Sequence, residues 1–259
     1  MKYLTTILLL ISVTIFAQNK ITGKQIIQNV YDRDTGTEVE GQLKMTLTNK
    51  SGNQRVRELK QYIKDFGDVE KKIMYFIKPA DVKNTSFMNW SYSDDKASNK
   101  ADDQWIYLPA LKKVKRISSD SKSDYFMGSD FTYDDLGDRK PSDDVHKLLR
   151  EEKLNGEDCY VVESTPKEED YMYSKTITWI VKDKWIGLQK KFYDEDEDFL
   201  KTLSIKKYKE IDGIITMLKT TMENDQNKHG TTMEFSEVKI NKGVKDNLFS
   251  ERMMKRGMK

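Results

Sequence analysis

Polar and apolar side chains alternate along much of this chain, and a period of two restricts what it can fold into. Leu43, Met45 and Leu47 alternate with polar neighbours, which is typical of a strand that buries one face. Comparable strand-like runs occupy residues 54–65, 73–77, 86–92, 104–108, 112–117, 158–164, 174–182, 187–193, 203–209, 214–222 and 231–240. Because mostly short polar turns separate them, the sequence predicts an antiparallel meander, hence a barrel or a strongly curved sheet.

The composition argues against several classes of function. The 259 residues include 45 Lys+Arg and 43 Asp+Glu, and this near-balance argues against a nucleic-acid-binding protein, which needs a large basic excess. Cys159 is the single cysteine, and His146 and His229 are the two histidines. These residues cannot build a usual zinc cage, and they offer little material for catalysis near neutral pH. We therefore expect no enzyme, no cofactor and no metal.

The first seventeen residues have the layout of a secretory signal peptide. Lys2 gives a positive start, residues 4–16 are mostly apolar, and Ala17 precedes a polar residue. This apolar run is too short to span a bilayer comfortably. We expect residues 1–17 to be a cleaved signal peptide and residues 18–259 to be a single domain. Gln18 stands where a lipid-anchored protein would have Cys, so we expect an exported protein without a lipid anchor.

Two regions depart from the strand pattern. Residues 21–30 place apolar side chains on one helical face, with Thr22 as a candidate N-cap. Residues 118–149 are rich in Ser, Asp and aromatic residues and carry helix-start signals at 129–130 and 142–144, so we expect His146 on a helix. This insertion is too long for a hairpin loop. We interpret it as a functional lid or binding loop.

The most specific pattern begins before the insertion and continues into it. It reads Trp-Ile-Tyr-Leu-Pro at residues 105–109, Arg-Ile-Ser at 116–118, and Phe-Met-Gly-Ser-Asp-Phe-Thr-Tyr-Asp-Asp-Leu at 126–136. These elements resemble the signature of the outer membrane lipoprotein-sorting proteins. That family is related to the LolA/LolB lipoprotein carriers, and its members often accompany export pumps of the resistance-nodulation-division type.

The resemblance implies a mainly β fold, an incompletely closed antiparallel β-barrel with short helices forming a lid over the open mouth. It implies a periplasmic carrier that binds a lipid or the acyl chains of a lipoprotein in an apolar cavity, without catalysis. The implied partners are an inner-membrane export complex, such as a pump of the resistance-nodulation-division type, and an outer-membrane acceptor. We expect the carrier to be a monomer.

The candidate ligand contacts are mainly the apolar residues of the lid. They are Phe126, Met127, Phe131, Tyr133 and Leu136. We add Trp90 and Trp105 as cavity candidates, because they lie on strands near the lid in sequence. Arg116, at the end of a basic run before the lid, is the candidate contact for a lipid headgroup or a partner protein. The alternative is that these aromatic residues fill an ordinary core.

Two other functions remain open. An exported hydrolase could use paired carboxylates of the insertion, although helix capping explains several of them. These acids are Asp120, Asp124, Asp130, Asp134 and Asp135. A structural or adhesive β-protein is the second alternative. The five acids at 194–198 lack the spaced ligands and the glycine of a calcium loop, so we expect a solvated turn there.

Overall fold

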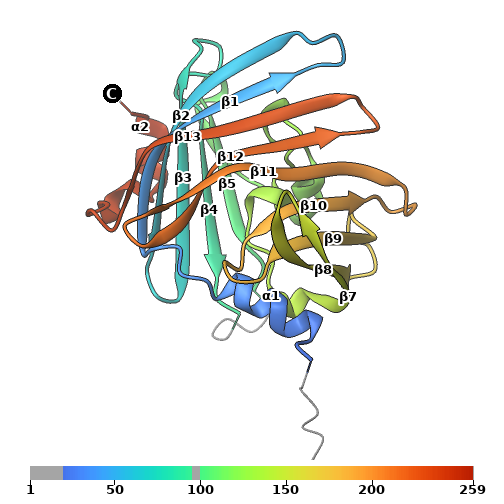
Figure 1. The fold of residues 1–259 in the computed structure, drawn as a ribbon. Helices are drawn as coiled ribbons and strands as arrows, with labels where there is room; N and C mark the ends of the chain where they lie inside the picture. Colours follow the sequence, from blue (N-terminus) through green and yellow to red (C-terminus); the bar gives the residue numbers. More distant parts are fainter. Residues whose placement is uncertain (1–19, 95–99, 259) are drawn as a thin grey trace, which may run out of the picture.

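The computed structural model describes residues 20–94 and 100–258, and one antiparallel sheet dominates that part of the chain (Figure 1). The sheet has thirteen strands within the described residues. They are β1 (Glu38–Thr48), β2 (Gln54–Asp65), β3 (Val69–Lys78), β4 (Ser86–Tyr92), β5 (Asp103–Leu108), β6 (Lys113–Arg116), β7 (Asp144–Leu154), β8 (Glu157–Pro166), β9 (Lys175–Val181), β10 (Gly187–Tyr193), β11 (Phe199–Ile211), β12 (Ile214–Asn224) and β13 (His229–Ile240). The predicted meander and the mainly β fold are confirmed.

The strand order shows why the sheet stays open. It runs β6-β5-β4-β3-β2-β1-β13-β12-β11-β10-β9-β8-β7. Strands adjacent in sequence are neighbours in the sheet, except β6 and β7, which lie at its two edges, and β1 pairs with β13 in the middle. The edge strands β6 and β7 do not pair with each other, and the sheet curves strongly between them (Figure 1). This is the incompletely closed antiparallel architecture that the sequence predicted.

The alternation of side chains gives the curved sheet two different faces. Leu43, Met45 and Leu47 of β1 are buried, whereas Gln42 just before them and Lys44 between the first two are exposed. We call the side that carries these three apolar residues the inner face and the opposite side the outer face. The main core cluster lies on the inner face, and a second cluster covers the outer side of β2–β6.

Two short α-helices cover different parts of the sheet. α1 (Gly23–Tyr31) packs against β7 and β8 at one end of the curved sheet (Figure 1). Thr22 is the N-cap, as the sequence predicted, and it forms a capping box with Gln25. Ile26 is fully buried. α2 (Glu251–Arg256) buries Met254 in the outer-face cluster, beside β4 and β6.

Residues 117–143 connect β6 to β7, and we call this segment the lid. It contains short 3₁₀-helices rather than strands of the sheet. They are η2 (Ser119–Ser123), η3 (Phe126–Gly128), η4 (Asp134–Leu136) and η5 (Pro141–Asp143), while η1 (Pro109–Leu111) and η6 (Asp246–Leu248) lie elsewhere. The short helices expected in a lid are therefore present.

The lid is shorter than the sequence suggested, and the expected helix around His146 is wrong. The helix-start signal at 142–144 produces one 3₁₀ turn, after which β7 begins at Asp144. Residues of β7 pair with β8 from Asp144 opposite Pro166 onward. Ladder pairing of this kind overrides the weak local preference for a helix. The predicted signal peptide, residues 1–17, lies outside the described residues.

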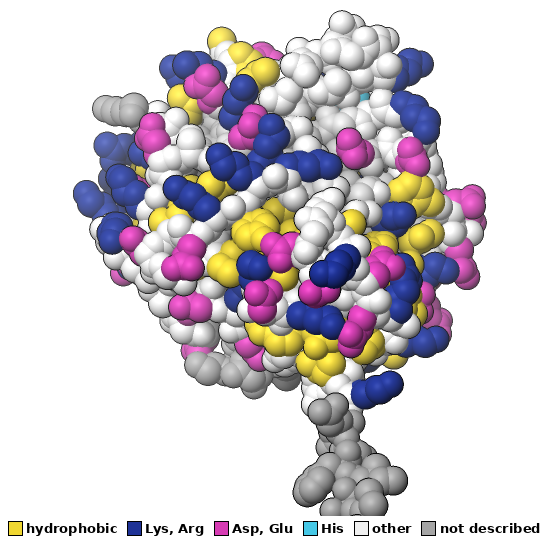
Figure 2. All heavy atoms as spheres, in the orientation of Figure 1, with side chains coloured by type: hydrophobic (Ala, Val, Ile, Leu, Met, Phe, Trp, Pro, Cys, Tyr) yellow, Lys and Arg dark blue, Asp and Glu magenta, His cyan; other side chains and the backbone are white. Residues whose placement is uncertain are grey.

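Charges of both signs are interspersed over the face that Figure 2 presents. Lys and Arg side chains gather around α2 on the left of the view. Among the described residues, no helix combines the length and the apolar character needed to cross a membrane.

We predict that the Ile26→Ala variant loses about 2–4 kcal/mol of unfolding free energy. Ile26 packs with Val162 and Ile180, and a cavity left there can collapse only in part. The half-buried Ile27 is the matched control, and Ile27→Ala should cost clearly less. Urea unfolding followed by circular dichroism measures both variants. Equal losses would contradict a specific role for Ile26 in docking α1.

Candidate functional site

Aromatic side chains of the lid are packed into the inner face of the sheet. Phe126 has no exposed surface, and its ring centroid lies 5.9 Å from that of Phe76 and 5.2 Å from that of Phe87. Tyr133 meets Phe126 edge-on at 5.6 Å, and Phe131 is buried beside them in the same cluster. The lid therefore completes the core that the open sheet cannot close by itself.

The backbone around residue 127 turns these aromatic residues toward the sheet. Met127 has a left-handed φ of 50°, and its carbonyl accepts a hydrogen bond from the Arg57 guanidinium. Met127 and Leu136 are partly buried against the inner-face cluster. All five lid residues singled out from the sequence thus lie together on the inner face. Ligand contact by any of them stays a prediction.

The structure does not bring Trp90 and Trp105 to this site. Their rings meet at 5.1 Å in the outer-face cluster. Alternation along β5 is the reason, because Ile106 belongs to the inner-face cluster and its neighbour Trp105 therefore points to the other side. Nearness to the lid in sequence did not determine which face these side chains occupy.

Arg116 also lies on the outer side, opposite Trp105 in the register of β5 and β6. Its side chain is 68% exposed and forms an ion pair with Asp103. The Asp103 carboxylate of this pair is largely buried, whereas the arginine side chain is open to solvent. A contact with a partner protein stays a prediction, but Arg116 does not face the space beneath the lid.

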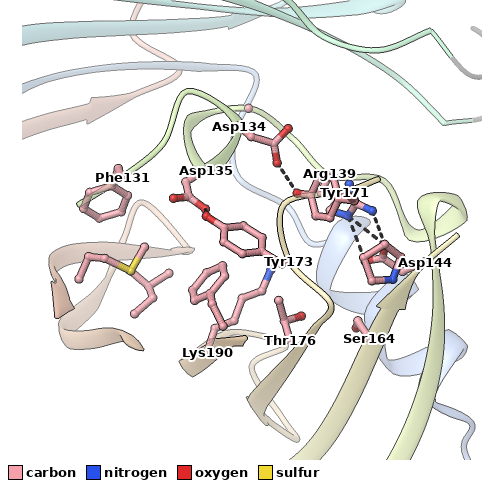
Figure 3. A pocket seen from close by; sticks show the side chains of 15 residues that line it. Phe131, Asp134, Asp135, Arg139, Asp144, Ser164, Tyr171, Tyr173, Thr176 and Lys190 are labelled. Carbon is pink, nitrogen blue, oxygen red and sulfur yellow. Dashed lines mark hydrogen bonds and ion pairs between the residues drawn. The ribbon is translucent and has the colours of Figure 1, made fainter. Parts of the chain in front are cut away.

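A cavity of about 230 Å³ lies between the lid and the inner face of β8–β12 (Figure 3). Lid residues from Phe131 to Arg139 cover one side, and strand side chains line the other. The lining residues are Phe131, Asp134, Asp135, Gly137, Arg139, Asp144, Ser164, Pro166, Tyr171, Tyr173, Thr176, Lys190, Phe192, Leu203 and Met222. The cavity is therefore apolar in one part and polar in another.

A buried ion pair holds the lid against this half of the sheet. The Lys201 side chain on β11 has no exposed surface, and its Nζ lies 2.6 Å from Asp135 Oδ2. The same ammonium donates to the Asp130 carbonyl at 3.0 Å, and the Tyr173 hydroxyl donates to Asp135 Oδ1 at 3.0 Å. A buried charge is costly unless it is paired and hydrogen-bonded, so these contacts favour one position of the lid.

Two further lid carboxylates have partners. Asp130 accepts from the Thr231 hydroxyl at 2.7 Å, and its Oδ2 lies 2.9 Å from His229 Nδ1. Asp134 accepts from the Tyr171 hydroxyl, and burial raises the pKa of Asp134. These contacts give the carboxylates a structural role in attaching the lid.

The polar end of the cavity is also organised by hydrogen bonds. Arg139 Nε lies 2.9 Å and 3.1 Å from the two Asp144 oxygens, and its guanidinium stacks on the Tyr171 ring at 3.7 Å. His146 Nε2 lies 2.9 Å from the Pro141 carbonyl, and Nδ1 lies 2.8 Å from Ser164 Oγ. Since a carbonyl only accepts, we assign the proton to Nε2, and Nδ1 then accepts from Ser164.

A second, more polar groove of about 720 Å³ runs beside this cavity and shares Asp134, Gly137, Arg139 and Tyr171 with it. Residues 100–104, the lid and residues 167–172 contribute most of its lining. No group of three or more His, Cys, Asp or Glu side chains in the described part of the chain could hold a metal ion. Polar side chains around the cavity and the groove form hydrogen bonds and ion pairs with one another.

Sequence reasoning missed the strand residues that face the lid, above all Lys190, which lines the cavity, and Lys201, which pairs with Asp135. A signal was present, since Lys190 stands two positions before Phe192 and Lys201 two positions before Leu203. Residues two apart on a strand share a face, so each lysine shares the face of an apolar residue. This pattern could be interpreted only once the structure showed which side of each strand belongs to the inner face.

We predict that Lys201→Met loosens the lid, because Asp135 is then buried without its cation. Loss of one partner of a buried pair costs about 3–5 kcal/mol. Trypsin should then cleave after Lys122 in the lid more rapidly than in the wild type. Lys207→Met, on an exposed residue of the same strand, is the control. Unchanged resistance of Lys201→Met to trypsin would contradict this role of the ion pair.

We predict that acid weakens the protein through His146. Burial lowers the pKa of His146 below its ordinary value of 6.5, so the unfolded chain takes up the proton more readily than the folded chain. This contribution to stability is present above about pH 6.5 and is lost as the pH falls below it. Urea unfolding at about pH 8 and about pH 5 should show a smaller difference for His146→Gln than for the wild type. A difference of the same size in both proteins would contradict the assignment.

Comparisons with known proteins agree with this architecture. A family model described as an uncharacterized protein matches residues 68–256. A solved outer membrane lipoprotein-sorting protein domain from Vibrio parahaemolyticus is 34% identical, with a TM-score of 0.83, over 90% of this chain and 98% of the other. A DUF1329 family protein from Desulfovibrio piger is 30% identical, with a TM-score of 0.83, over 90% of this chain and 97% of the other.

A more distant likeness extends the fold assignment. A LolA superfamily protein from Nitrosomonas europaea is 18% identical, with a TM-score of 0.68, over 90% of this chain and 99% of the other, and this similarity concerns the fold alone. No curated protein matches the sequence. On the strength of the match to the Vibrio domain, the chain belongs to the outer membrane lipoprotein-sorting protein family and has a LolA-like fold.

Proposed function

We propose that this protein is a periplasmic carrier that holds an acyl chain between the inner face and the lid and passes it toward the outer membrane without chemistry. The observation that carries the proposal is the way in which the inner face is covered. Lid aromatic residues such as Phe126 fill it, and the lid is not a strand of the sheet. A cover of this kind can leave without breaking the ladder between the strands.

The size of the cavity supports a lid that moves. Its volume of about 230 Å³ is below the ~300–1,000 Å³ of typical ligand pockets. An acyl chain longer than this space would take the place of lid side chains, because both are apolar and need the same inner face. In the proposed cycle, loading displaces the lid aromatic residues, and release lets them return to the core.

The relative from Vibrio parahaemolyticus is named for lipoprotein sorting, and the sequence begins with signal-peptide features. We therefore propose export through residues 1–17 and a carrier domain spanning 18–259. An inner-membrane export complex would load this carrier, and an outer-membrane acceptor would receive the acylated cargo. We propose that the carrier acts as a monomer.

The hydrolase alternative gains no specific support from the described residues. Asp130, Asp134 and Asp135 each have a structural partner, and Asp120 and Asp124 lie exposed on the lid. The structural or adhesive alternative does not explain why charged groups are placed around an internal cavity. The carrier function accounts for both the lid and the cavity.

Native mass spectrometry tests the carrier function with Phe131→Asp. Phe131 lines the cavity, and a carboxylate there disfavours an apolar chain by more than about 1.4 kcal/mol, which corresponds to tenfold in binding. We expect an adduct of lipid mass on protein purified from the periplasm. The adduct fraction should fall at least about tenfold in the variant.

Phe249→Asp is the matched control, because Phe249 is equally buried but belongs to the outer-face cluster. Circular dichroism must show that both variants are folded, and the control should keep the adduct. A wild-type protein that carries no adduct and takes up no added fatty acid would contradict the carrier function. Equal loss of the adduct in both variants would show that lipid binding does not depend on the cavity.

A further inference from the structure

Lys190 is the charged group of the cavity that lacks a partner. Asp135 pairs with Lys201, Arg139 pairs with Asp144, and Asp134 accepts from Tyr171. Lys190, in contrast, has no hydrogen bond and no ion pair to any residue in the part of the chain that the structure describes. Its Nζ lies over the Phe192 ring at 5.0 Å, a contact that satisfies none of its donors.

The position of Lys190 directs its ammonium into the cavity rather than toward bulk solvent. It lies in the middle of β10, paired with Thr178 of β9 and Leu203 of β11. Figure 3 shows its side chain rising from the strand toward the space below Tyr173. Burial lowers the pKa of Lys190, and the nearby carboxylates of Asp135 and Asp144 oppose that effect.

Two hydroxyl groups from the neighbouring strands complete a polar end of the cavity. Ser164 of β8 and Thr176 of β9 are register partners, and both line the same space as Lys190. His146 accepts from Ser164, as assigned above, which fixes the position of that hydroxyl oxygen. Phe131, Phe192, Leu203 and Met222 form the apolar remainder of the lining.

The Lys190 ammonium and the Thr176 hydroxyl group supply donors at one end of an apolar space, since the Ser164 proton is already donated to His146. Such an end matches an amphiphile with an acidic headgroup. We propose that Lys190 binds the anionic group, a carboxylate or a phosphate, of the acyl-chain ligand, whose apolar part lies against the strand residues Phe192 and Leu203. This rests on the proposed carrier function and specifies its ligand class. The ligand supplies the acceptor that the half-buried ammonium lacks, and a charge-assisted hydrogen bond then forms beneath the lid.

The charges around the cavity allow this assignment. Lys190 and Arg139 line the cavity together with the carboxylates of Asp134, Asp135 and Asp144, and Lys201 reaches Asp135 from beside it. Burial raises the pKa of Asp134, and the other two carboxylates are already paired, Asp135 with Lys201 and Asp144 with Arg139. An incoming anion would then meet Lys190 without displacing either of the two ion pairs.

The test compares three ligands of one chain length by isothermal titration calorimetry on lipid-free protein. They are dodecanoate, dodecyl phosphate and dodecanol, which provide a carboxylate, a phosphate and a neutral hydroxyl. We expect at least one of the two anions to bind at least about tenfold more tightly than dodecanol. The anion that does so identifies the headgroup as that of a fatty acid or of a phosphate ester.

Lys190→Met should remove this preference and leave the affinity for dodecanol nearly unchanged. Lys191→Met is the matched control. Lys191 is the next residue on β10, its Nζ lies 5.7 Å from the Trp179 ring, and Lys191 does not line the cavity. The ligand-free Lys190→Met protein should melt at the same or a higher temperature, because the variant loses no hydrogen bond or ion pair among the described residues and no longer holds a half-buried charge without a partner.

Several results would overturn the proposal. The preference for an anion could be absent from the wild type, or it could survive Lys190→Met. A lower melting temperature of Lys190→Met, with equal losses of affinity for all three ligands, would show a structural lysine instead. These results leave the carrier function intact as long as dodecanol binds. If none of the three ligands binds to the wild type, the carrier function fails as well.

Discussion

An open, strongly curved sheet has an inner face that must be covered, and the rest of this structure depends on how that is done. The edge strands β6 and β7 do not pair, so the covering comes from the lid and from α1. Phe126 occupies the apolar half of the face, and the ion pair of Asp135 with Lys201 anchors the other half. These side-chain contacts determine whether the inner face is closed or available.

The two halves of the inner face explain the composition of the lid. Beneath the lid, β1–β5 present side chains such as Phe76 and Phe87, whereas β8–β11 add lysines and hydroxyl groups. Residues 126–136 carry aromatic and acidic residues in close alternation. The aromatic ones pack on the apolar half and the acids meet cations and hydroxyl groups on the polar half. The motif at residues 126–136 therefore allows one segment to pack on both the apolar half and the polar half of the inner face.

The sequence predicted the meander, the capped helix at residues 21–30 and the position of the lid, because each rests on local periodicity or capping. It did not show which face each strand turns inward, and so it misplaced Trp90 and Trp105. Nor did it distinguish one 3₁₀ turn before β7 from a helix that would carry His146. The sequence could not single out Lys190 as a candidate site residue. Its environment is set by non-local strand pairing, which places β10 beneath the lid, and by residues far away in sequence.

The packing of the lid also suggests how a carrier could bind apolar cargo and still release it. Burying one large apolar side chain stabilises by about 1.5–3 kcal/mol, and burying one methylene by about 0.8 kcal/mol. Displacing Phe126, Phe131 and Tyr133 would therefore cost about as much as burying some six to eleven methylenes would return. Loading then replaces the lid side chains on the inner face by an acyl chain with a similar free energy of burial. Neither the empty nor the loaded state is therefore favoured strongly. A headgroup contact at Lys190 would shift this near-balance toward the loaded state, and contacts with an acceptor could shift it back.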